Sequence, residues 1–155
     1  MSENNNDVLV ELVKTALNKV YENHYYLIEK QVHERSIVFW FGVYFNELLK
    51  VSEFAGYDLD FEYNKDHSNP KRTENFPNGT FPDIILHKRG TNERNLLIIE
   101  FKTYWQNDIE IDIAKLIDFT SLDGKYKYPL GLSILFNRKE HNLRLVREGK
   151  VLTDE

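Results

Sequence analysis

Three residues on two neighbouring apolar segments have the types and the spacing that metal-dependent hydrolysis requires. Asp83 stands near the start of one segment, and Glu100 and Lys102 stand at the end of the next. Because side chains alternate between the two faces of a strand, Glu100 and Lys102 are predicted to project from one side and Phe101 from the other. Two carboxylates and a lysine brought together in this way could bind a divalent cation beside a phosphate.

The expected hairpin places Asp83 opposite Glu100. Strands are predicted over residues 81–87 and 96–102, and Gly90-Thr91-Asn92 between them has the composition of a turn. If the chain reverses within this turn, the two acids face each other with Cβ atoms about 5 Å apart. Like charges in such a pair destabilise a sheet unless a positive group lies between them. Mg²⁺, which binds one or two carboxylates and keeps several waters, is the natural candidate.

Lys102 lies one strand repeat beyond Glu100 and would stand beside this metal. There it could orient an attacking water or stabilise charge that develops on a phosphoryl group. The alternative is that Asp83 merely stands at a strand entrance and that Glu100 and Lys102 belong to a solvated strand face. Against that alternative, Leu96 and Ile98 precede Glu100 on the same face. A face that is apolar along its length and charged only at one end favours a site.

The elements that would position these residues follow an order typical of a mixed α/β architecture. Apolar periodicity predicts two helices before the strands and one among them, and the polar segment 65–78 is expected to be an exposed loop. Asn107 is the predicted N-cap of the third helix. The predicted elements are, in order, helices 7–21 and 33–51, strands 57–64, 81–87 and 96–102, a helix from 107 to about 123, a strand 130–136 and a hairpin-like tail.

Several polar residues have a structural explanation as well as a functional one. Asp60 and Glu62 are expected on an exposed face of strand 57–64, although Glu62 could approach the site from there. Glu34 stands one step before the apolar stripe of the second helix, where an acid is also favoured for electrostatic reasons alone. His33 and His87 are expected to be structural, because the sequence has no histidine spacing typical of a metal site.

The motif residues carry a family resemblance. Pro82-Asp83, followed by Glu100-Phe101-Lys102, resembles the PD-(D/E)xK motif of the restriction-endonuclease-like nuclease superfamily. Glu34 is similar to the helical acidic residue that often completes the metal site of its members. The segment Asp112 to Leu116 is similar to the crossover helix that follows the motif. Further likeness to a group of uncharacterised bacterial members comes from Glu62-Tyr63-Asn64 and His33-Glu34-Arg35-Ser36. The resemblance covers residues 34–136.

The resemblance implies one nuclease-like domain over residues 1–155, with a mixed central sheet flanked by helices. It divides this domain into an N-terminal helical extension (1–30), a core (31–137) and a C-terminal hairpin or tail (138–155). It also implies hydrolysis of a phosphodiester by metal-activated water, with Mg²⁺ as cofactor, Mn²⁺ as a substitute and nucleic acid, DNA above all, as substrate. The implied residues are Asp83, Glu100 and Lys102 in catalysis, Asp83, Glu100, the Phe101 carbonyl and Glu34 as metal ligands, and Glu62, Asp112 and Lys115 in accessory roles.

Composition limits the other classes of function. The net charge of −5 counts against a nucleic-acid coat protein, although basic residues between Lys71 and Lys139 could gather on one face. No apolar run approaches the roughly 20 residues that a bilayer requires, and the first residues have no signal-peptide pattern. With no cysteine, thiolate chemistry is excluded and a cytoplasmic setting is expected. Phosphate-binding glycine loops and serine nucleophile motifs are absent from the sequence.

Two other functions stay open. A catalytically silent nuclease-fold module could bind protein or nucleic acid, which would suit the acidic charge and small size. The chain could also be a subunit of a larger nuclease or defence assembly whose partner supplies substrate recognition. Aromatic residues surround the second helix beyond one stripe, which would suit burial on two sides or a homodimer contact; they are Phe39, Trp40, Phe41, Tyr44 and Phe45.

Overall fold

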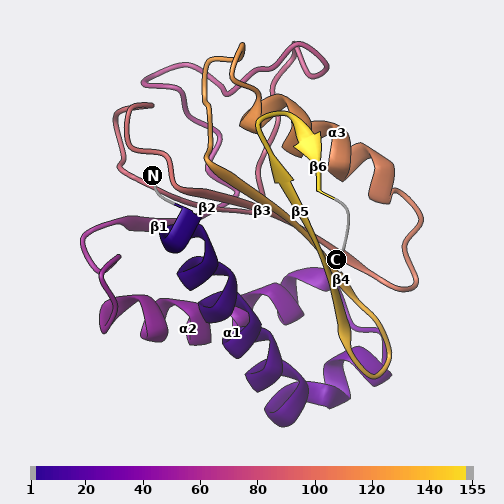
Figure 1. The fold of residues 1–155 in the computed structure, drawn as a ribbon. Helices are drawn as coiled ribbons and strands as arrows, with labels where there is room; N and C mark the ends of the chain where they lie inside the picture. Colours follow the sequence, from indigo (N-terminus) through magenta and orange to yellow (C-terminus); the bar gives the residue numbers. More distant parts are fainter. Residues whose placement is uncertain (1–2, 153–155) are drawn as a thin grey trace. The chain divides into compact units, whose positions relative to one another are not determined.

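The structure, a computed structural model, describes residues 3–152 as an α/β protein (Figure 1). Residues 1–2 and 153–155, where the predicted N-terminal extension begins and the predicted tail ends, lie outside the described residues. The elements in chain order are α1 (Glu3–Glu29), α2 (Glu34–Lys50), β1 (Asp58–Phe61), β2 (Ile84–His87), β3 (Leu97–Thr103), α3 (Ile109–Thr120), β4 (Leu130–Phe136), β5 (His141–Arg147) and β6 (Lys150–Val151).

The strands form one mixed sheet in the order β1-β2-β3-β4-β5-β6. β1 pairs antiparallel with β2, and β2 pairs antiparallel with β3. β3 and β4 are neighbours although α3 separates them in sequence, and the N–H of Tyr104 donates to the carbonyl of Phe136 just beyond their C-terminal ends. Strands that end side by side after a helical crossover run parallel. The predicted mixed α/β architecture is therefore confirmed, whereas a restriction-endonuclease-like core stays a prediction.

The chain divides into two compact units, and β3, β4 and β5 contribute residues to both. Unit 1 comprises the chain up to Gly56 together with Phe101–Asn107 and Leu135–Asn142. Its helices α1 and α2 bury apolar stripes, as their sequence periodicity predicts. In the same unit the Phe101 ring lies 5.0 Å from the Phe41 ring of α2 and stacks on Phe136 at 5.7 Å.

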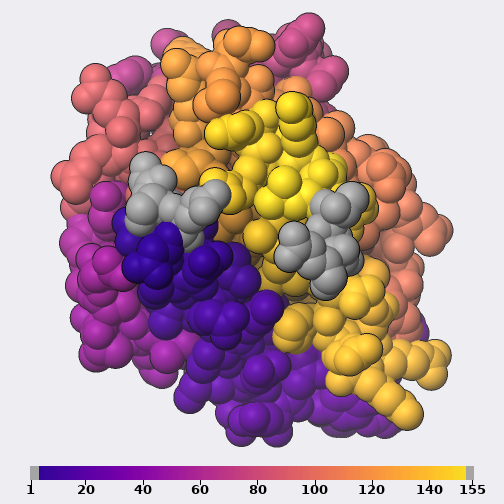
Figure 2. Space-filling view, viewed as in Figure 1, coloured from indigo at the N-terminus to yellow at the C-terminus, as the bar shows by residue number. Residues whose placement is uncertain are grey.

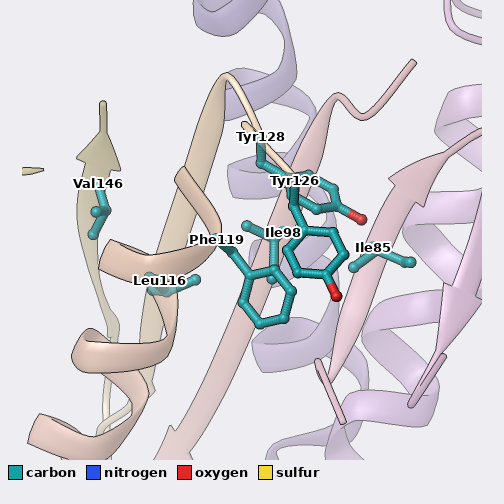
Figure 3. Packing of buried hydrophobic residues seen from close by; sticks show 7 residues of the cluster. All are labelled: Ile85, Ile98, Leu116, Phe119, Tyr126, Tyr128 and Val146. Carbon is teal, nitrogen blue, oxygen red and sulfur yellow. The ribbon is translucent and has the colours of Figure 1, made fainter. Parts of the chain in front are cut away.

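Unit 2 comprises Tyr57–Glu100, Asp108–Ile134 and the chain from Leu143. Its apolar core joins side chains of β2, β3, α3, the segment before β4, and β5, which point toward one another in Figure 3. Gly131 of β4 allows α3 to approach, because a Cβ there would lie 3.0 Å from Cγ2 of Thr120 and 3.4 Å from Leu116. The core residues are Ile85, Ile98, Leu116, Phe119, Tyr126, Tyr128 and Val146. The end of β5 and the short β6 lie at the surface in Figure 2 (yellow).

Strand β1 is shorter than predicted, and one of its faces differs from the expected one. Asp60, expected on an exposed face, has a side chain only 14% exposed and bonds to His87, whereas Phe61 is 45% exposed. The reason is the pairing with β2, which puts Asp58 opposite His87 and so brings Asp60 diagonally within reach of the imidazole. His87, expected to be structural, is buried at the centre of this contact.

One further expectation is wrong, and another, the exposed loop 65–78, holds for most of its residues but not for all. Helix α3 begins at Ile109 with Asp108 as its N-cap, rather than with Asn107, and the Asp108 side chain makes no capping hydrogen bond. The predicted exposed loop contains buried charges, since Lys71 is 1% exposed and Asp66 is 5% exposed. The Lys71 ammonium lies over the rings of Tyr63 and Tyr126, 5.7 and 4.7 Å from their centroids. Aromatic faces compensate part of the lost hydration of a cation, and a polar sequence pattern does not reveal them.

Candidate active site

The β2–β3 hairpin has the register that the sequence predicts. Ile84 pairs with Ile99, Ile85 with Ile98 and Leu86 with Leu97. Asp83 lies directly before β2, which begins at Ile84 rather than at the predicted residue 81, and a hydrogen bond joins its side chain to that of Glu100. The carbonyl of Asp83 also accepts the N–H of Glu62, the residue after β1, at 3.1 Å. The backbone therefore brings the two acids of the motif together.

Glu100 is a buried carboxyl group whose charge the protein compensates only in part. Its side chain is 1% exposed, and its Oε1 atom accepts no hydrogen bond. Burial raises the pKa of Glu100 well above its usual value, and the negative charges of Asp83 and Asp112 raise it further, while Lys115 lowers it. A hydrogen bond between two carboxyl groups requires a proton on one of them. The hydrogen bond between Asp83 and Glu100 therefore requires that the pair share one proton.

Helix α3 contributes an ammonium group to this pair. Lys115 Nζ lies 3.8 Å from Glu100 Oε1, and the Lys115 side chain is 19% exposed. Asp112, almost one turn earlier on the same helix, is buried. Leu116 and Phe119 anchor α3 in the core that includes Ile98 of β3. Asp112 and Lys115 were predicted only as accessory residues. In the structure the charges of both act on the pKa of Glu100.

Neighbouring residues of β3 point to opposite faces. Glu100 faces Lys115 of α3, whereas Phe101 contacts Phe41 within unit 1. By the same alternation, Lys102 projects from the Glu100 side of the strand, and its side chain is half-buried. The catalytic role of Lys102 stays a prediction.

The remaining predicted site residues have simpler surroundings. Glu34 is the first residue of α2, directly after the N-cap His33, whose ring accepts the Arg35 N–H at 3.2 Å. Glu62 is exposed and has a positive φ of 49°, and its N–H donates to the carbonyl of Asp83. The ligand role of Glu34 and the accessory role of Glu62 stay predictions.

The donor set fits a hard divalent cation with few protein ligands. Across residues 3–152, no three histidine, aspartate or glutamate side chains form a group that could hold a metal ion. The Asp83–Glu100 pair nevertheless offers carboxylate oxygens only, and the buried Glu100 Oε1 lacks a donor. Mg²⁺ commonly binds one or two carboxylates and completes its shell with water. The two acids therefore fit such an ion.

A turn beside this site was missed by sequence reasoning. Residues Thr73 to Phe76 form a tight turn, closed by backbone hydrogen bonds of 3.2 and 3.1 Å between its ends. Asp118 of α3 accepts hydrogen bonds from the Thr73 hydroxyl and from the backbone and side chain of Asn75. The Phe76 ring centroid lies 5.9 Å from Lys115 Nζ. No spacing in the sequence links these segments, which are brought together only by the fold.

Comparison of the chain with protein-family models, with curated proteins and with solved structures found no match. Among the helices between residues 3 and 152, none combines the length and the apolar character that crossing a bilayer requires.

Proposed function

We propose that this protein is a metal-dependent phosphodiesterase that hydrolyses nucleic acid, with DNA as the favoured substrate. The observation that carries the proposal is the pair of Asp83, directly before β2, and the buried Glu100 of β3, two acids whose side chains are in hydrogen-bond contact. Such a pair is unfavourable in a sheet, and a shared cation relieves it. A strained group of titratable residues beside a lysine is typical of functional sites rather than of structural ones.

In the proposed site, Asp83 and Glu100 hold one Mg²⁺ ion, which Mn²⁺ can replace. When bound, the ion supplies an activated water and neutralises charge on a phosphoryl oxygen. Glu100 releases the shared proton to solvent as the cation takes its place. Asp112, buried and negative, favours positive charge at the pair. The Phe101 carbonyl, Glu34 and Glu62 keep the ligand and accessory roles that the resemblance implies.

Two lysines have different tasks in this proposal. Lys115 contacts a phosphoryl oxygen of the substrate, because its ammonium already lies 3.8 Å from a proposed metal ligand and is partly open to solvent. Lys102, on the Glu100 side of β3, orients the attacking water. Both lysines act through their positive charge, and neither becomes covalently attached to the substrate.

Titration calorimetry with Mn²⁺ tests the metal site without requiring a known substrate. The wild-type protein should bind one ion and release a proton, which is measured by repeating the titration in buffers of different ionisation enthalpy. Glu100→Gln should abolish this binding, whereas Asp123→Asn, which removes an exposed charge from the same unit, should leave it unchanged. Equal binding by wild type and Glu100→Gln would refute the site.

Cleavage assays test the reaction itself. Single- and double-stranded DNA and RNA are incubated with the protein and Mg²⁺ or Mn²⁺, and products are separated by length. Asp83→Ala and Lys102→Ala should each abolish cleavage while the variants stay folded, as judged by circular dichroism. Cleavage that survives both substitutions belongs to a contaminant or to another site.

A non-catalytic module that binds protein or nucleic acid is the second candidate. It is favoured by the lack of a third acidic ligand within the described residues and by the net charge of −5. Such a module needs no divalent ion, so the calorimetric result separates the two functions. A homodimer or a larger assembly stays a prediction; Phe39 on α2 is 56% exposed, and light scattering at several concentrations tests self-association.

A further inference from the structure

The turn Thr73–Phe76 is docked on the same surface of α3 that carries Lys115. Lys115 and Asp118 are three residues apart, so their side chains are neighbours on one side of the helix. Asp118 accepts the Thr73 hydroxyl at 2.6 Å and the Asn75 backbone N–H at 3.1 Å on one oxygen, and the Asn75 side-chain amide at 2.8 Å on the other. One carboxylate thus holds both backbone and side chains of the turn.

The turn borders a cavity whose lining does not include Lys115. A cavity of about 700 Å³ lies between this segment and the C-terminal end of α3. Residues 72–75 and Pro77 line it, whereas Phe76 does not. Phe76 instead lies near Lys115, with its ring centroid 5.9 Å from Nζ. The segment therefore presents its polar side chains to the cavity and its one aromatic ring to the ammonium.

Lys115 has a flexible side chain that needs such a neighbour. A lysine has four rotatable carbon–carbon bonds and a strongly hydrated head, so it does not keep one position unless its surroundings restrict it. An aromatic ring near the ammonium attracts it and occupies space that other rotamers would use. The Lys115 ammonium therefore has two neighbours that restrict its position, the Phe76 ring and Glu100 Oε1 at 3.8 Å.

We propose that Asp118 is a positioning residue of the proposed active site: it holds Phe76 near Lys115 through the turn Thr73–Phe76 and so keeps the Lys115 ammonium beside Glu100, ready for a substrate phosphate. This inference rests on the proposed function. Lys115 would touch the substrate, and Asp118 would act only through the turn and the ring.

The test uses two matched pairs of variants in the full chain. Asp118→Ala removes all three hydrogen bonds to the turn. Asp123→Ala is its control, because Asp123 lines the same cavity and carries the same charge but accepts none of those three bonds. Thr73→Val removes one hydroxyl donor with little change of shape, and Thr73→Ser keeps it. Phe76→Leu provides the reference for a turn without an aromatic ring.

Two measurements are made on each variant. The ring current of Phe76 displaces the proton chemical shifts of the Lys115 ε-methylene group, which reports the contact directly. The kcat and KM for Mg²⁺-dependent cleavage of an oligonucleotide report the consequence. In Asp118→Ala and Thr73→Val the Lys115 shifts should move toward those of Phe76→Leu, and KM should rise about fivefold with kcat changed less than about twofold, because a ground-state phosphate contact is weakened. Asp123→Ala and Thr73→Ser should match wild type.

The outcomes separate this inference from the proposed function. Lys115 chemical shifts that stay at their wild-type values in Asp118→Ala overturn the positioning role. If the wild-type protein cleaves nucleic acid, an Asp118→Ala variant with the wild-type KM overturns it as well. A wild-type protein that cleaves neither DNA nor RNA removes the proposed function and the substrate contact together. If the Asp118→Ala variant fails to fold, the Thr73 pair decides the same question.

Discussion

Two groups of buried charges lie on the strands of unit 2, and only one of them is satisfied by the protein. Asp60 of β1 accepts a hydrogen bond from His87 at 2.7 Å and two from the Arg89 guanidinium at 2.6 and 2.9 Å. Burial by itself would raise the pKa of Asp60, but the hydrogen bonds from Arg89 and His87 hold it below the usual value. This carboxylate is fully occupied and stays charged.

Glu100 of β3 differs from Asp60 because its carboxylate lacks such donors. Burial and the charge of Asp83 raise its pKa, and one of its oxygens accepts no hydrogen bond. Lys115 at 3.8 Å compensates only part of the charge. Both carboxylates are in sheet positions of the same unit, although Glu100, 1% exposed, is buried more deeply than Asp60, 14% exposed. The distinction is whether donors surround the acid, and the acid without enough donors is the one that a cation would complete.

The largest expected effect separates the two acids by activity. Glu100→Gln should lower the kcat/KM of Mg²⁺-dependent cleavage about a thousandfold, because the metal ligand is lost. Asp60→Asn, the same chemical change at the satisfied acid, should keep the activity of its folded fraction. Initial rates at matched concentrations of folded protein decide this. Equal losses in both variants would end the distinction between them.

The second effect concerns stability. Asp60→Asn should destabilise the protein by about 2 to 3 kcal/mol, because His87 and Arg89 lose their charged acceptor. Urea unfolding at pH 7 measures the change. Asp58→Asn is the control, since Asp58 is more exposed and lies 4.0 Å from Arg89, and it should cost less than about 1 kcal/mol. A larger loss of stability in Asp58→Asn would show that the contact with Arg89, rather than burial of the acid, determines the destabilisation.

The third effect asks whether every poorly compensated buried charge indicates a ligand. Burial lowers the pKa of Lys71 to about 8, although Asp66 raises it in part. Since the unfolded chain binds the proton more tightly, the protonated lysine opposes folding below pH 8, and this penalty declines as pH rises from 8 toward 10.5.

Lys71→Met should therefore stabilise the protein by about 2 kcal/mol at pH 7, with the gain fading at alkaline pH. Unfolding curves from pH 6 to 10.5 measure it, and Lys65→Met, an exposed lysine of the same loop, should change little. A strong loss of stability in Lys71→Met would instead show that its aromatic contacts outweigh the burial penalty.

The smallest effect is the stability of the metal-free site. Because the folded pKa of Glu100 is raised, the unfolded chain releases this proton first, and stability should fall as pH rises above about 4.5. Glu100→Gln removes that slope and should be more stable than wild type by about 1 kcal/mol at pH 8 in a chelator. Addition of Mn²⁺ should reverse the order. A metal-free wild type as stable as Glu100→Gln at pH 8 would mean that Lys115 fully satisfies the acid.

Features that depend on neighbours along the chain could be predicted from the sequence. The β2–β3 register follows from a short hairpin and two apolar strands, so the opposition of Asp83 and Glu100 follows from local spacing. β4 has the predicted bounds, Leu130–Phe136, and α2 departs from prediction by one residue at each end. Alternation along β3 likewise separates Glu100 from Phe101.

What could not be predicted depends on segments far apart in the sequence. The same polar pattern that indicated an exposed face for Asp60 and an exposed loop around Lys71 is compatible with burial once a donor or an aromatic ring is supplied from elsewhere. Asp118 and the turn that it holds are 43 to 45 residues apart.

The sequence by itself therefore determined the hairpin and the candidate acids, because periodicity and short turns act over a few residues. Only the tertiary structure decided which buried acid is satisfied, since packing brings donors from distant segments to one carboxylate and leaves another short of them.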